Sequence, residues 1–246
     1  MVEKLNLVPF KGIKMHKIQI ELRKLAKPEK IPIYKNFFKT GKGEYGEGDE
    51  FIGVTVPGSR KVAKANIDIS YEDLAQIVKS RIHEDRLCAL IILVYKSEKA
   101  KTEQEKRQAV DWYLKYHLFG NNWDLVDVIA PKILGPWLIH RDKSLLYEYA
   151  HSSSLWERRI AILTTLHFIR QGEFKDTIKI SQILLNDEHD LIHKAVGWML
   201  REIGKKDQKE LVDFLNKHYK NMPRTMLRYS IERLSERLKS SYLAKT

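Results

Sequence analysis

The sequence predicts an all-α protein in which antiparallel helix pairs stack into a superhelical solenoid. Apolar residues recur with helical spacing along nearly the whole chain, and strand-like alternation is confined to FIGVTV at 51–56. Helix pairs also recur at intervals of roughly 35–40 residues, which is typical of two-helix repeats. No sharp motif repeats at a fixed period, so a compact helical bundle is the alternative. With 246 residues, 43% of them hydrophobic, the chain can bury a large core, and we expect a single domain over 1–246.

Several local signals fix where helices begin in the first half of the chain. Pro28 stands at the start of one amphipathic segment, and Ser70, with Asp73 three residues later, is a good N-cap for another. The glycine-rich segment 40–50 is expected to be a surface loop, and the almost continuously apolar segment 83–96 should be central. The helices expected here cover 15–26, 28–38, a segment that follows FIGVTV and ends near 66, 70–80, 83–96 and 103–119.

The second half continues the helical pattern. Ser154-x-x-Glu157 has the form of a capping box, in which each side chain binds the backbone of the other residue. The helices expected here cover 121–138, 154–170, 175–186, 188–203, 208–220 and 223–239.

The charge balance points to a polyanionic partner. Forty-four Lys and Arg residues outweigh 32 Asp and Glu residues, giving a net charge of +12. Nucleic acid is the first candidate, an anionic membrane surface is the second, and a merely basic protein is the third. No apolar run is long enough to span a membrane, and the N-terminus lacks the features of a secretory signal. The single cysteine, Cys88, excludes an internal disulfide framework and fits a reducing, cytoplasmic setting.

Familiar ligand and catalytic motifs are weak or missing. GKGEYG at 41–46 matches a dinucleotide-binding pattern, but a helix precedes it and the acidic residues around it would repel a pyrophosphate. The nine histidines show no zinc-ligand spacing, and Cys88 lies among apolar residues that indicate a core position. We therefore expect neither a metal nor a cofactor.

The first notable helix face carries Trp123 and Asp127. Asp124 is explained by its place in the first helical turn, where it complements the helix dipole. Asp127 lies deeper in an apolar run, one turn beyond Trp123 and on the same face. An ordinary ion pair with a neighbouring basic helix is one explanation, and a functional carboxylate is the other.

Two further faces carry cations at helical spacing. Arg159 interrupts an otherwise apolar row at the edge of a buried stripe, whereas its neighbour Arg158 can be solvated. Lys194, Trp198, Arg201 and Lys205 form one basic row, which can contact phosphates or can be a solvated face with one packing tryptophan. Asp127, Arg159 and Trp198 are separated by 32 and 39 residues, close to one repeat each. Successive inner helices of a solenoid would therefore place these residues side by side.

These segments resemble a known family. NNWDLVDVIAPKILG, LWERRIAIL and IHKAVGWMLREIGK, in this order and spacing, are similar to the AlkD-type alkylpurine DNA glycosylases, which are HEAT-like repeat proteins of DNA alkylation repair. FIGVTVPGSRKVAK and HEDRLCALIILVYK also look like that family. The resemblance covers roughly residues 30–210.

The resemblance implies a HEAT-like superhelix with a concave basic groove, and hydrolysis of the N-glycosidic bond of cationic N3- and N7-alkylpurines in double-stranded DNA without a base-flipping pocket. By the matching motifs, Asp127 corresponds to the catalytic carboxylate, Trp123 and Trp198 to the active-site tryptophans, and Arg159 to an arginine that contacts the DNA backbone. Asn122 departs from members that carry a second tryptophan there, and the 40–50 loop is longer than in some. Further DNA-binding candidates are Arg158, Lys194, Arg201, Lys205 and Arg60.

This chemistry is reasonable without a cofactor. An alkylated purine is already cationic, so it leaves without a general acid, and a fixed carboxylate stabilises the positive charge that grows on the sugar. We expect a monomer that wraps a duplex. The rival hypotheses are a non-catalytic protein that binds bent or branched DNA, and a HEAT scaffold whose basic face binds an acidic protein.

Overall fold

The computed structural model describes residues 15–244, and this part of the chain is all-α. It contains fourteen α-helices and four short 3₁₀ helices, and its β pairing is a single isolated bridge between Glu50 and Ile82. The prediction of an all-α fold is confirmed. The N-terminal residues 1–14, on which the expectation about a secretory signal rests, lie outside the described part. None of the described helices is long and apolar enough to cross a bilayer.

Two compact units make up the chain, Met1–Lys96 and Ser97–Thr246, and each is considered by itself. In the first unit, the cap expected at Ser70 is present, because its hydroxyl accepts the backbone N–H of Asp73 at 3.0 Å. Thr55 caps the helix after FIGVTV in the same way. The helices are α1 (Lys17–Arg23), α2 (Ile31–Phe37), α3 (Val56–Ala65), α4 (Tyr71–Ile77) and α5 (His83–Lys99).

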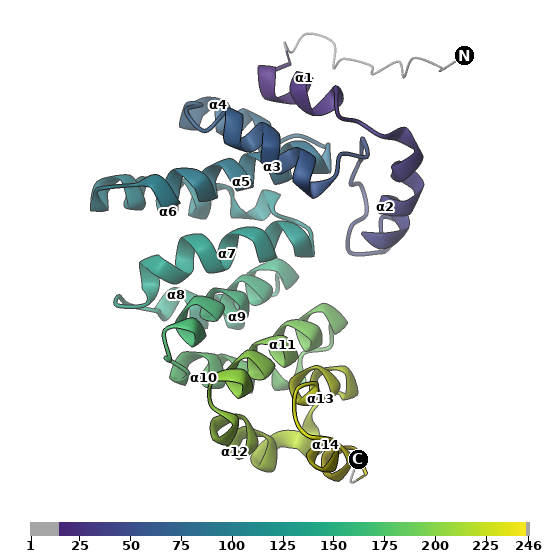
Figure 1. Ribbon diagram of the computed structural model, residues 1–246, viewed down its shortest axis with the longest axis vertical. Coiled ribbons are helices and arrows are strands. Elements are labelled where there is room, and N and C mark those ends of the chain that lie inside the picture. Colours follow the sequence, from purple (N-terminus) through teal and green to yellow (C-terminus); the bar gives the residue numbers. More distant parts are fainter. Residues whose placement is uncertain (1–14, 245–246) are drawn as a thin grey trace. The chain divides into compact units, whose positions relative to one another are not determined.

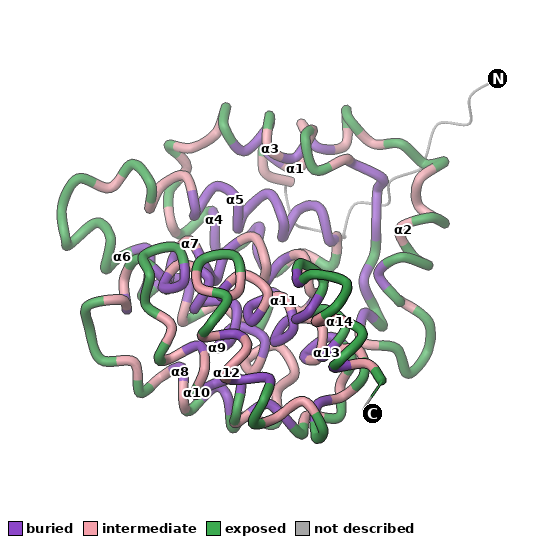
Figure 2. The backbone as a smooth tube through the Cα atoms, turned by 60° about the horizontal axis from the view of Figure 1, so that its bottom comes forward, coloured by how far each residue is buried: buried purple, intermediate pink, exposed green. Residues whose placement is uncertain are grey.

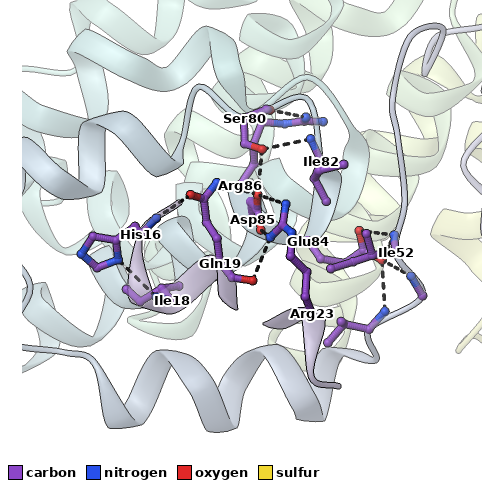
Figure 3. A network of polar contacts seen from close by, with 12 residues as sticks. His16, Ile18, Gln19, Arg23, Ile52, Ser80, Ile82, Glu84, Asp85 and Arg86 are labelled. Atoms are coloured by element: carbon purple, nitrogen blue, oxygen red, sulfur yellow. Dashed lines mark hydrogen bonds and ion pairs between the residues drawn. The ribbon is translucent and has the colours of Figure 1, made fainter. Parts of the chain in front are cut away.

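The stretch FIGVTV does not form a strand: residues 51–55 are irregular and Val56 begins α3. The carboxylate of Glu84 accepts the backbone N–H groups of Ile52, Gly53 and Val54, at 3.1, 2.7 and 3.1 Å, as Figure 3 shows for part of this cluster. A side chain therefore satisfies the donors that a neighbouring strand would otherwise bind. Gly53 has a φ of +81°, and a Cβ there would lie 2.0 Å from the carbonyl oxygen of Lys27, so only glycine fits.

The start of α5 is polar and yet buried. Asp85 accepts hydrogen bonds from Gln19, Arg23 and Ser80 (Figure 3). Asp49 binds Arg86 at 2.7 Å and is itself buried. The expectation that 40–50 is a surface loop is therefore wrong at its end, because Asp49 compensates a buried guanidinium.

The middle of α5 lies in the core of the first unit, as predicted. Every residue from Leu87 to Val94 is buried, and Figure 2 shows α5 as a buried segment. Cys88 is among them, and burial raises the pKa of its thiol to about 12. The expectation that Cys88 is a core residue is confirmed.

The second unit consists of two rows of helices (Figure 1). One row is α7 (Trp123–Leu138), α9 (Leu155–Arg170), α11 (Asp190–Lys206) and α13 (Arg224–Ile231), each packed on the next. The helices α8 (Ser144–Ala150), α10 (Lys175–Ile183) and α12 (Gln208–His218) pack beside this row, and α6 (Glu103–Tyr116) packs on α7. The helix expected over 223–239 is divided into α13 and α14 (Glu236–Leu243), because Ser235 caps a new helix. This alternation of two rows is consistent with a solenoid.

Glycines set the close spacing of the first row. A Cβ on Gly135 of α7 would lie 2.4 Å from the Cβ of His167 on α9. A Cβ on Gly197 of α11 would lie 2.6 Å from the carbonyl oxygen of Met226 on α13. Because real atoms do not approach so closely, the close packing of these helix pairs requires glycine, which has no Cβ, at both positions.

Candidate functional site

The N-terminal half of α7 carries the first candidate residues. Asn122 is buried and its side chain accepts the backbone N–H of Trp123 at 2.8 Å, which begins the helix. Asp127 follows one turn after Trp123, so both lie on one face. Pro131 lies four residues beyond Asp127 and has no N–H to bond the carbonyl of Asp127. We did not predict a role for Pro131, although its position was visible in the sequence.

Arg159 on α9 binds Asp127 through a two-pronged contact. Its Nε donates to Oδ1 and its Nη2 to Oδ2, both at 2.8 Å. Its Nη1 donates to the backbone carbonyl of Leu191 on α11 at 2.6 Å. One guanidinium thus joins α7, α9 and α11, and it fixes the orientation of the carboxylate.

This ion pair is mostly removed from water. The Arg159 side chain is 5% exposed and that of Asp127 is 19% exposed. Burial raises the pKa of the Asp127 carboxyl, the guanidinium of Arg159 opposes that rise, and the nearby Asp124 adds to it. The carboxylate therefore combines limited access to solvent with a fixed direction, and both are useful for charge stabilisation. The ion pair that the sequence offered as one explanation for Asp127 is present.

The two tryptophans occupy different positions relative to this pair. Trp123 is half-buried, on the same face of α7 as Asp127. Trp198 is also half-buried and donates its indole N–H to Glu202 at 3.1 Å. It lies seven residues beyond Leu191, which is about 10 Å along α11. That both indoles flank the carboxylate stays a prediction.

The basic row on α11 is paired with carboxylates. Lys194 binds Asp190 at 2.7 Å and Lys205 binds Glu202 at 2.6 Å. Arg201 binds Glu232, which follows α13. Three cations thus meet three carboxylates, and the row carries much less uncompensated charge than its sequence indicates. A phosphate would have to compete with these partners.

Arg158 and Arg60 lie in different surroundings. Arg158 donates to Asp187 at 2.6 Å and to the carbonyls of Ser152 and Ser153. The expectation that Arg158 is solvated is therefore wrong, because its guanidinium donates hydrogen bonds to backbone carbonyls of the turn before α9 and to Asp187. Arg60 is half-buried on α3, in the first unit. DNA contact by either residue stays a prediction.

The capping box expected at the start of α9 forms only in part. Ser154 accepts the backbone N–H of Glu157, but the Glu157 carboxylate binds His117 at 3.0 Å and the hydroxyl of Ser152. These two contacts lower the pKa of Glu157 against the opposing effect of its burial. The sequence could not show that His117 would compete for this carboxylate, because forty residues separate the two.

A metal centre has no visible basis in the described residues. No group of three or more His, Cys, Asp or Glu side chains between residues 15 and 244 could hold a metal ion. The strongest chemical feature of this region is the Asp127–Arg159 pair.

Comparison with known proteins places the chain in a family. A family model described as "DNA alkylation repair enzyme" matches residues 18–234. A solved structure, described as a predicted DNA alkylation repair enzyme from Enterococcus faecalis, superposes with a TM-score of 0.66. It is 16% identical, and the match covers 86% of this chain and 97% of that one, so it shows similarity of fold. No curated protein matches the sequence. Because the family model covers most of the chain, this protein belongs to the DNA alkylation repair enzyme family.

Proposed function

We propose that this protein is a DNA glycosylase that hydrolyses the N-glycosidic bond of cationic N3- and N7-alkylated purines in duplex DNA. Membership of the family supports an enzyme of DNA repair with a DNA substrate. The observation that carries the finer proposal is the Asp127 carboxylate, held by Arg159 and still 19% exposed. A carboxylate is the group that this reaction needs most.

The reaction can proceed with Asp127 and water. The bond between C1′ and the purine nitrogen breaks, and its electron pair neutralises the purine, which leaves without a proton donor. Positive charge grows on the deoxyribose, and the Asp127 carboxylate stabilises it. Water then adds to C1′ and releases a proton, and the same carboxylate can orient that water.

Arg159 acts in this proposal as a positioning residue. It binds both oxygens of Asp127 at 2.8 Å, and each carboxylate oxygen keeps a further lone pair. Its positive charge also weakens the field of Asp127 at the sugar. The contact with the DNA backbone that the resemblance implies would bring a phosphate to the guanidinium and offset part of that charge, while Arg159 still holds Asp127. Because Arg159 is 5% exposed in the free protein, this contact requires the guanidinium to become more exposed.

The tryptophans would recognise the cationic nucleotide. Indole faces attract cations and pack against sugars, so in this proposal Trp123 would contact the deoxyribose next to Asp127. Trp198 would contribute from α11 when DNA bridges the two helices. In this proposal the lesion is recognised through the backbone and not in a base-flipping pocket.

The test is release of methylated bases from duplex DNA. DNA treated with a methylating agent is incubated with wild type or with Asp127→Asn, and free bases are separated by chromatography. We expect wild type to release methylpurines and Asp127→Asn to bind DNA but lose release by at least about 100-fold. An unchanged rate in the variant would refute the assigned role of Asp127.

A non-catalytic DNA-binding function is the second candidate. The observation that favours it is the compensation of Asp127 by Arg159, which is also what a purely structural ion pair would show. It predicts DNA binding by wild type with no base release from any methylated duplex. The same chromatographic experiment separates the two candidates.

A further inference from the structure

The end of α1, the turn after it and α2 carry a concentration of positive charge. Residues 24–42 contain six lysines and one carboxylate, Glu29. Five of the lysines are exposed and Lys30 is half-buried. Within residues 15–244, none of the six forms an ion pair. We call this set the α2 lysines: Lys24, Lys27, Lys30, Lys35, Lys39 and Lys42.

The carboxylates that follow in the sequence form no ion pair with these lysines. Glu44 and Glu47 accept the backbone N–H groups of Gly41 and Gly43, on either side of Lys42, at 2.7 and 2.8 Å, so they offset part of the charge at that end of the set. Asp49 binds Arg86, and the next residue, Glu50, binds Arg81. The α2 lysines thus differ from Lys194, Arg201 and Lys205 of α11, each of which has a carboxylate partner.

An apolar row lies among these lysines. Ile33 and Phe37 are one helical turn apart on α2, and they are 64% and 58% exposed. A neighbouring side of α2, about 100° round the helix, is anchored, since the rings of Tyr34 and Phe38 pack on Phe51 with centroids 5.9 and 5.2 Å apart. Figure 2 shows α2 with exposed residues along much of its length. The ring of Phe37 packs edge to face on Phe38 with centroids 5.1 Å apart, yet Phe37 and Ile33 both keep more than half of their surface exposed.

We propose that this surface binds duplex DNA, with the α2 lysines on phosphates and with Ile33 and Phe37 against the sugars and base edges of the minor groove. Free cations suit phosphates, because no existing ion pair has to break. Apolar side chains beside cations are typical of proteins that bind and widen the minor groove. The inference rests on duplex DNA being the substrate, as in the proposed function, but not on which reaction follows.

An anionic membrane is the competing partner for a basic and apolar surface. Helices that lie in a membrane interface bury a broad apolar face. The seven residues of α2 offer two large exposed apolar side chains, Ile33 and Phe37, and the one other aromatic residue of the helix, Tyr34, packs on Phe51. DNA therefore fits the surface better.

The experiment compares binding of undamaged duplex DNA at several salt concentrations. The test variant replaces Lys24, Lys27 and Lys30 with Gln. The matched control replaces Lys175, Lys179 and Lys217, three exposed lysines on α10 and α12, and removes the same charge. The slope of log affinity against log salt falls by about 0.9 for each phosphate that the protein no longer neutralises, so the slope should fall by about 2.7 in the test variant and by less than about 1 in the control.

A second variant tests the apolar contact. Phe37→Ser should weaken binding at least about fivefold and leave the salt slope unchanged, because it removes packing but no charge. Ile33→Leu keeps an apolar side chain and is expected to bind as wild type does.

Each outcome decides the matter. Equal slope changes in the lysine test and control variants would mean a general charge effect and would overturn the proposal. The same variants are also assayed for binding to vesicles that contain phosphatidylserine. If the lysine test variant loses vesicle binding while its salt slope for DNA equals that of wild type, the surface binds membranes instead of DNA. The binding experiment uses undamaged DNA and does not depend on base release. If wild type released no methylated bases, the glycosylase proposal would be refuted, but the assignment of the DNA-binding surface would still hold.

Discussion

The ion pair between Asp127 and Arg159 gives the sharpest prediction about stability. The change is Asp127→Ala, alone and together with Arg159→Met. Asp127→Ala leaves a guanidinium that is 5% exposed with one remaining acceptor, the Leu191 carbonyl. We expect the single change to destabilise the second unit and the double change to restore much of the stability.

The magnitude follows from burial. Removing one partner of a buried pair costs about 3–5 kcal/mol, whereas an exposed pair contributes about 0–1 kcal/mol. The pair is close to the buried limit on the arginine side, and the 19% exposure of Asp127 moves the value toward the lower end. We therefore expect a destabilisation of about 3 kcal/mol for Asp127→Ala, and a coupling of about 2 kcal/mol between the two positions.

The assay can be confined to the unit that contains the pair. All five tryptophans lie at or beyond Trp112, within Ser97–Thr246. Urea unfolding followed by tryptophan fluorescence therefore reports on the second unit. A destabilisation below about 1 kcal/mol, or additive effects in the double variant, would refute the interpretation of this contact as a buried, orienting pair.

Three further predictions concern pH and packing. Burial raises the pKa of Asp127, and only the ionised carboxylate can stabilise the cationic sugar, so base release should fall as the pH drops through that raised pKa. Arg159→Gln removes the charge that opposes this rise and should move the midpoint of the pH profile to higher pH. A midpoint that does not move would contradict the assignment of the pH dependence to Asp127. Gly135→Ala should cost about 1–3 kcal/mol in urea unfolding, because its Cβ meets the Cβ of His167, whereas Gly204→Ala, which meets chiefly the tip of a leucine, should be nearly neutral. Glu84→Ala removes the acceptor of three buried N–H groups and should destabilise the first unit by at least about 3 kcal/mol; thermal unfolding by circular dichroism that matches wild type would show that water replaces the carboxylate.

Local features were predicted well because they depend on neighbouring residues. The helices, the N-caps at Ser70 and Ser154 and the buried position of α5 all follow from spacing and side-chain chemistry within a few residues. FIGVTV was ambiguous for the same reason, since alternation predicts an extended backbone but not its partner. That partner, Glu84, lies about thirty residues away and replaces a neighbouring strand.

Ion pairs were predicted poorly because they depend on which helices become neighbours. Arg158 looked solvated, but Asp187 and two carbonyls bind it. The row on α11 looked basic, but one of its partners, Glu232, follows a different helix. Sequence spacing places a charge on a face and does not say what faces it.

The sequence by itself determined the helical architecture, the net positive charge and the family to which the motifs of Asp127 and Trp198 point. The tertiary structure alone decided that Arg159 holds both oxygens of Asp127, that Glu232 pairs with Arg201, and that the α2 lysines have no carboxylate partner among the described residues. The physical reason is range. Helix formation and the ion pairs within one helix are governed by contacts three or four residues apart, whereas the Asp127–Arg159 and Arg201–Glu232 pairs join groups that folding brings together from about thirty residues away.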